Sequence, residues 1–108
     1  MAKRKPKKGY VYLLQSSSNT NLFKFGCTTL TPEKRCKKVN QDNPSAFFGV
    51  ISCFKSFDIF SDENNIKHGL LPGGAGLLGE IFDISDCDDF KNGTDVMQKF
   101  LMVAGVIK

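Results

Sequence analysis

The sequence predicts an α+β domain with a small, mainly antiparallel sheet of three to four strands flanked by helices. Short runs rich in aromatic and β-branched residues have the composition of strands, and two longer stretches have helical spacing. The predicted order is strand, strand, helix, strand, helix, a short strand and a terminal helix. With 108 residues, 41% of them hydrophobic and 24% charged, the chain has the size and composition of one globular domain.

The first two strands form a predicted hairpin. We expect strands over Gly9–Gln15 and Leu22–Cys27, joined by the polar loop Ser16–Asn21. Because side chains alternate along a strand, one face of the hairpin receives its apolar residues and resembles a core. The other face receives a hydroxyl and an amine, Tyr12 and Lys24, which we expect to lie opposite each other.

A short helix and a central strand should follow. Thr31 is a predicted N-cap with Pro32 at the first helical position, and we expect the helix over Glu33–Asn40. Its buried side should carry Cys36 and Val39, with Lys34, Lys37 and Lys38 mostly outward. The next strand, Phe47–Phe54, is apolar enough to lie inside a sheet.

The second half of the chain is less regular. Helical spacing runs over Phe57–Leu71, a glycine-rich surface loop is expected at Pro72–Gly79, and Glu80–Ile84 should be a short strand. Ser85 or Asp86 should cap the last helical region, which we expect to break at Asn92-Gly93 and to restart at Thr94.

The cysteines and the apolar runs constrain the cellular setting. Cys27, Cys36, Cys53 and Cys87 include no C-x-x-C pair, so they match neither a zinc knuckle nor a dense disulfide framework. We expect free, mostly buried thiols in a reducing cytoplasm, bacterial or host. The longest apolar runs are too short to cross a bilayer, and no secretory signal or membrane partner is expected.

The positive charge is concentrated in residues 1–8, which we interpret as a flexible basic arm preceding a single domain over residues 9–108. The net charge of the chain is +4. The arm supplies five cations, namely Lys3, Arg4, Lys5, Lys7 and Lys8. Such an arm can contact phosphates through counterion release, which gives affinity without sequence reading. A solubilising or targeting tail is the alternative.

Four ordered segments resemble the GIY-YIG nuclease superfamily, and more closely its small phage and bacterial branch (T5orf172 and Mug113-like). They are Tyr10-Val11-Tyr12, Lys24-Phe25-Gly26, the continuation Gly26-x-Thr28 with Pro32-Glu33-x-Arg35, and His68 followed by Gly79-Glu80-Ile81-Phe82. The resemblance covers about residues 9–85. It implies a metal-dependent endonuclease that hydrolyses phosphodiester bonds in DNA, with a phage or other mobile element as its source.

The resemblance also implies roles for single residues. Glu80 stands where the family holds one divalent metal, Mg²⁺ or Mn²⁺, and a hard cation can be bound by one carboxylate plus substrate phosphate. Tyr12 would activate or orient the attacking water, helped by a nearby cation, Lys24 or Arg35. Arg35, in the first turn of its helix, would grip phosphate oxygens. His68 would donate a proton or contact phosphate. Lys34 and Lys38 join the basic arm as expected nucleic-acid contacts.

The sequence departs from the family pattern at three places, and the second and third keep an alternative open. Lys24 replaces the second tyrosine of the superfamily's best-known pattern, although lysine is usual in the phage-type branch. Asn64 stands where an acid commonly precedes the histidine by four residues, with Glu63 one position away. The glycine-rich segment lacks the basic residues often found there. The alternative is a catalytically inactive domain that binds nucleic acid or protein. A third possibility is a small host-interaction protein that shares only the hairpin–helix arrangement. Isolated GIY-YIG domains usually borrow specificity, so a protein partner that supplies it is also considered.

Overall fold

The computed structural model describes residues 6–70, 81–85 and 90–106 of the chain. The elements are β1 (Gly9–Ser16), β2 (Leu22–Thr28), α1 (Pro32–Asp42), β3 (Phe48–Ser56), α2 (Ile59–Gly69), β4 (Ile81–Asp83) and α3 (Gly93–Val103). The four strands form one antiparallel sheet in the order β3-β1-β2-β4. The predicted α+β class is therefore confirmed.

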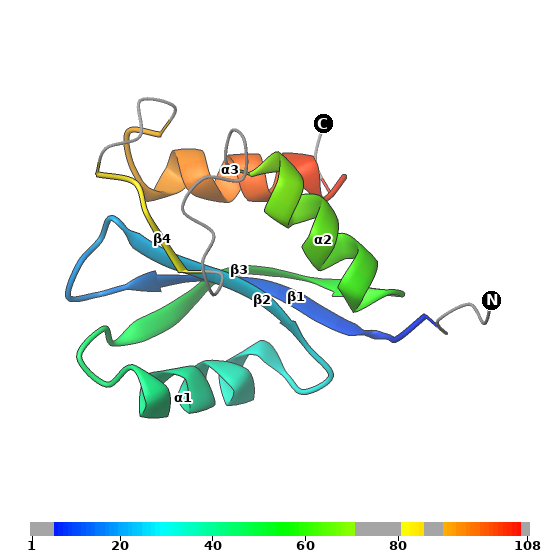
Figure 1. The fold of residues 1–108 in the computed structure, drawn as a ribbon, viewed down its shortest axis with the longest axis horizontal. Helices are drawn as coiled ribbons and strands as arrows, with labels where there is room; N and C mark the ends of the chain where they lie inside the picture. Colours follow the sequence, from blue (N-terminus) through cyan, green and yellow to red (C-terminus); the bar gives the residue numbers. More distant parts are fainter. Residues whose placement is uncertain (1–5, 71–80, 86–89, 107–108) are drawn as a thin grey trace.

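Helices cover both faces of the sheet (Figure 1). α1 lies on one face, while α2 and α3 lie on the other. We call these the α1 face and the α2/α3 face. Within the described ranges, no helix is long and apolar enough to span a membrane.

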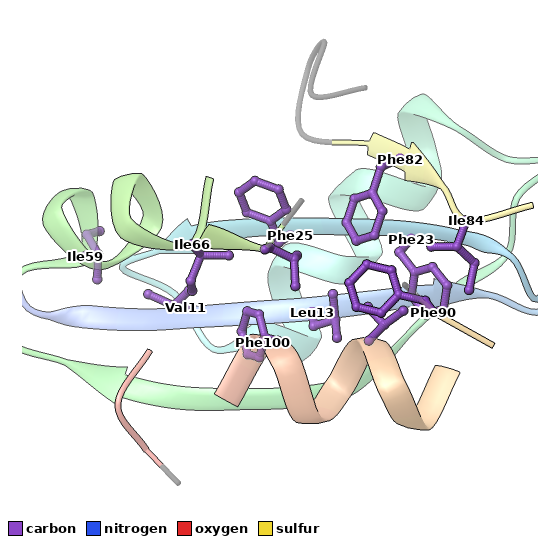
Figure 2. Packing of buried hydrophobic residues seen from close by; sticks show 12 residues of the cluster. Val11, Leu13, Phe23, Phe25, Ile59, Ile66, Phe82, Ile84, Phe90 and Phe100 are labelled. Carbon is purple, nitrogen blue, oxygen red and sulfur yellow. The ribbon is translucent and has the colours of Figure 1, made fainter. Parts of the chain in front are cut away.

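The larger core fills the α2/α3 face. Figure 2 shows its phenylalanines and aliphatic residues directed between the sheet and the two helices. Phe23 and Phe82 stack with their ring centroids 5.6 Å apart, which fixes β4 against β2. The buried members of this core are Val11, Leu13, Phe23, Phe25, Ile59, Ile66, Leu70, Phe82, Ile84, Phe90, Val96 and Phe100.

A smaller core lies on the α1 face. It contains the buried residues Tyr12, Leu14, Cys36, Val39, Ala46 and Phe48. The predicted burial of Cys36 and Val39 is confirmed. The face that the sequence assigns to a hydroxyl and an amine is therefore also a packed face, because α1 covers it.

A β-bulge in β3 divides its aromatic residues between the two cores. The register against β1 shifts between Leu13, which pairs with Ser52, and Leu14, which pairs with Val50. Strict alternation would place Phe48 and Phe54 on the same face. Because the bulge inserts one extra residue, Phe48 joins the α1 face, whereas Phe54 packs on Phe100 with their ring centroids 5.6 Å apart.

The end of the chain differs from the prediction. Phe90, Lys91 and Asn92 are not helical, and α3 begins at Gly93. The Asn92 side chain caps this helix by accepting hydrogen bonds from the backbone N–H groups of Thr94 and Asp95. The predicted restart at Thr94 is therefore confirmed within one residue. The helical stretch that Ser85 or Asp86 should cap would begin in residues 86–89, which lie outside the described residues, as does the predicted loop Pro72–Gly79.

Candidate active site on the α1 face

Local sequence fixes the position of α1 at both ends. Thr31 accepts a hydrogen bond from the backbone N–H of Lys34 at 3.3 Å, and Pro32 occupies the first turn. Farther along the helix, the Asn40 amide donates to the carbonyl of Phe48 at 2.9 Å and accepts from its N–H at 2.7 Å. These two hydrogen bonds connect α1 to the start of β3. They fix the position of α1 relative to the sheet.

This placement brings Arg35 to Tyr12. The Arg35 Nε donates to the phenolic oxygen of Tyr12 at 3.4 Å. Tyr12 is only 1% exposed, whereas Arg35 is half-buried. A guanidinium beside a phenolic oxygen stabilises negative charge that develops there. The two residues that the sequence assigned to one site are in contact.

Lys24 shares the α1 face but not in the predicted register. The expectation that Tyr12 and Lys24 lie opposite each other is wrong: Tyr12 pairs with Gly26, and Lys24 pairs with Leu14. The loop length of the hairpin sets this register. Lys24 is thus the diagonal neighbour of Tyr12, at about 7–8 Å in an antiparallel pair. Lys24 is buried, and Gly26, which has no side chain, leaves the position opposite Tyr12 uncrowded.

Arg35 also lines an open hollow of about 280 Å³ at one end of the sheet. The walls come from the end of β2, the turn into α1 and the start of α2. Thr28 was part of the sequence motif, whereas Thr29 and Phe60 were not singled out. The sequence did contain a signal for Phe60. Helical spacing places Ile59 on the buried side of α2, so the apolar Phe60 next to it should be exposed, and an exposed aromatic residue can mark a binding surface. The lining residues are Lys7, Cys27, Thr28, Thr29, Leu30, Arg35, Ile59 and Phe60.

His68 lies on a different layer. It is exposed on the last turns of α2, and α2 packs through Ile59 and Ile66 on the α2/α3 face. Figure 2 shows these two isoleucines beside Val11, on the side of the sheet away from α1. The described structure therefore joins Tyr12, Arg35 and Lys24 on one face and places the helix of His68 on the other.

Comparison with known protein families identifies the family of this chain. The T5orf172 domain matches residues 9–86, which is more than half of the chain. The chain belongs to the T5orf172 domain family. Searches of the curated proteins and of the solved structures found no match. The T5orf172 family is nuclease-related, consistent with a nuclease-like or DNA-binding module.

The expected metal ligand of this T5orf172 domain, Glu80, lies outside the described residues. The next residue, Ile81, begins β4 and pairs with Lys24. At the other end of β4, the Ser85 backbone N–H donates to Asp83 at 2.7 Å, and hydrogen bonds from Ser85 lower the pKa of the Asp83 carboxyl. Among the described residues, no group of three or more His, Cys, Asp or Glu side chains is placed to hold a metal ion.

The other predicted residues have simpler surroundings. Lys34 and Lys38 are exposed on α1, and Lys7 and Lys8 are exposed before β1. The remaining cations of the basic arm, Lys3, Arg4 and Lys5, lie outside the described residues.

The three described cysteines, Cys27, Cys36 and Cys53, are not in disulfides. The prediction of mostly buried thiols is wrong for them, because only Cys36 is buried and Cys53, on β3, is exposed. Burial, followed by the nearby Glu33 carboxylate, raises the pKa of the Cys36 thiol.

Proposed function

We propose that this T5orf172 domain is a metal-dependent endonuclease that hydrolyses phosphodiester bonds in DNA. The observation that carries the proposal is the contact between the Arg35 guanidinium and the Tyr12 hydroxyl, beside an open hollow at the end of the sheet. A phosphate in that hollow would meet Arg35 first, and the phenolic oxygen would lie directly behind the guanidinium.

The residues divide the work as follows. Arg35 binds a phosphate oxygen and neutralises charge in the transition state. Tyr12 orients the attacking water, with its oxygen held by Arg35. Lys24 adds positive charge on the same face. Glu80 would hold Mg²⁺ or Mn²⁺, and His68 remains a candidate proton donor or phosphate contact. A bound metal ion would supply Lewis-acid neutralisation and lower the pKa of water.

One observation favours a second candidate function. Because Tyr12 is 1% exposed, its hydroxyl is covered in this structure, and activity requires Arg35 or its neighbours to move when DNA binds. A domain in which that movement does not occur would bind DNA without cutting it. The alternative is therefore a catalytically inactive module that binds nucleic acid or a protein partner.

A plasmid-nicking assay separates the two. Supercoiled plasmid is incubated with Mg²⁺ or Mn²⁺ and the wild type, Glu80→Ala or Arg35→Ala, with Lys37→Ala as a control because Lys37 is an exposed residue of the same helix. We expect nicking by the wild type and the control, and its loss in the other two. Nicking that survives Glu80→Ala would contradict the single-metal mechanism. Plasmid binding without nicking in either metal would establish the inactive module.

A further inference from the structure

A second hollow adjoins the one that contains Arg35. It has a volume of about 320 Å³, at the small end of the range of ligand pockets, and lies where β1 begins and β3 ends. Its lining is Lys8, Gly9, Tyr10, Lys55, Ser56 and Phe57. Two lysines and two aromatic rings thus share one small concave surface. Tyr10 belongs to the first motif and Lys8 to the basic arm, but Lys55 and Phe57 have no role in the motifs or in the proposed catalytic site.

The two hollows are lined by residues that are close neighbours. Lys7 lines the first and Lys8 the second. Gly9 of the second lies so close to Thr28 of the first that a Cβ at Gly9 would lie 2.3 Å from the Thr28 carbonyl oxygen. The Lys7 carbonyl also accepts a hydrogen bond from the backbone N–H of Ile59 at 2.9 Å, so this segment is held against the start of α2 (Figure 1).

The aromatic rings on this surface are unusually open. Phe57 is 80% exposed and Phe60 is 44% exposed. The Lys8 ammonium lies over one face of the Phe57 ring, 5.6 Å from the ring centroid, so a base would stack on the opposite face. An exposed ring of this kind offers a flat apolar face that water solvates poorly and that a nucleobase can cover.

The charged side chains that line the two hollows are of one sign, although the Asp62 carboxylate lies next to them, hydrogen-bonded to Ser56. Among the described residues that line the two hollows, the charged ones are Lys7, Lys8, Lys55 and Arg35, all of them cations. Exposed aromatic rings among cations are the composition of sites that bind single-stranded nucleic acid, because the bases stack on the rings while the phosphates meet the positive charge. A base inside a duplex is already stacked on its neighbours and cannot use the ring in this way.

We propose that this surface, formed by Lys7, Lys8, Tyr10, Lys55 and Phe57, binds an unpaired segment of DNA next to the Tyr12–Arg35 site. A base stacks on Phe57, Lys8 and Lys55 contact its phosphates, and the strand continues over Lys7 toward Arg35. The inference rests on the proposed function, since it names the form of DNA that the same site receives: a flap, a gap or a frayed end and not an intact duplex.

The test measures binding without cleavage. A fluorescently labelled 15-nucleotide thymine strand and a duplex of the same length are titrated with the full chain in EDTA, followed by anisotropy. We expect the wild type to bind the single strand more tightly. Phe57→Ala should weaken that binding about tenfold and leave duplex binding nearly unchanged, and Phe57→Tyr should restore it. Lys55→Gln should weaken binding and reduce its salt dependence by about 0.7 in log–log slope.

Phe47→Ala is the matched control. Phe47 is 63% exposed and lies at the opposite end of β3, about 30 Å away along the strand. Its loss should leave single-strand affinity unchanged. Equal single-strand affinities of the wild type and Phe57→Ala, or a wild type that prefers duplex, overturn the inference. Nicking that depends on Glu80 would still uphold the proposed function in that case. Conversely, Phe57-dependent binding by a protein that never nicks would uphold this site alone.

Discussion

The two faces of the sheet are built differently. The α2/α3 face is covered by two helices, and its buried hydrophobic cluster has twelve described residues, all of them aliphatic or phenylalanine. The α1 face is covered by one helix, and its buried cluster of six includes a tyrosine and a cysteine, with a buried lysine on the same face. The β1–β2 hairpin contributes to both faces through alternate side chains. The α2/α3 face therefore contributes most of the apolar burial that stabilises the hairpin, and the α1 face can carry polar groups.

The largest expected effect tests the stabilising face. Phe100 is fully buried and packs on Phe54. Phe100→Ala should lower the free energy of unfolding by about 3–5 kcal/mol, because it removes a large apolar side chain and leaves a cavity. Urea denaturation followed by circular dichroism measures this loss. Phe48→Ala on the smaller α1-face cluster should cost less. Equal losses would contradict the unequal contribution of the two faces.

The next effect tests the chemical face. Tyr12→Phe keeps the ring but removes the hydroxyl that Arg35 contacts. We expect the nicking rate to fall by about a hundredfold, which corresponds to ~2.7 kcal/mol of activation free energy. Unfolding free energy should change by about 1 kcal/mol, the net value of a typical hydrogen bond. Plasmid nicking and urea denaturation on the same preparation provide both numbers. A large loss of stability with unchanged nicking would show that the Tyr12 hydroxyl stabilises the fold and takes no part in catalysis.

The smallest effect concerns pH. Burial raises the pKa of the Cys36 thiol, so the folded protein keeps this proton more tightly than the unfolded chain. The contribution is complete below the unfolded thiol's pKa, near 9.0, and is lost as the pH rises above it. Wild-type stability should therefore decline as the pH rises above about 9, and Cys36→Ala should make that decline shallower. Parallel stability curves for the two proteins would show that Cys36 makes no such contribution.

Much of the fold could be predicted from local patterns. The alternation of residues in β1 and β2 and the Thr31-Pro32 start of α1 depend on neighbours in the chain, and each was found within one or two residues of its predicted place. The start of the last helix was predictable too: the sequence predicts a restart at Thr94, and α3 begins one residue earlier, with Asn92 as its cap. The helical stretch predicted before it is wrong at residues 90–92, which are not helical.

The candidate site was predicted as a set of residue types but not as a geometry. The motifs named Tyr12, Arg35 and Lys24, and the structure places all three on the α1 face. It also places Lys24 opposite Leu14 and not Tyr12, and it places His68 on a helix of the other layer. Phe57 was predicted only as the start of a helix, since exposure cannot be seen in a sequence that spaces its apolar residues irregularly.

The sequence by itself determined the α+β class, the hairpin, the capped start of α1 and the residue types of the site. These follow from alternation, turn chemistry and capping, which act over a few residues. Only the tertiary structure decided the register of β1 with β2, the bulge that sends Phe48 and Phe54 to opposite faces, and the hydrogen bond from Ile59 to the Lys7 carbonyl, which holds the segment before β1 against the start of α2. Those features depend on loop length and on packing between segments that are distant in the chain. A pattern of neighbouring residues does not contain that information.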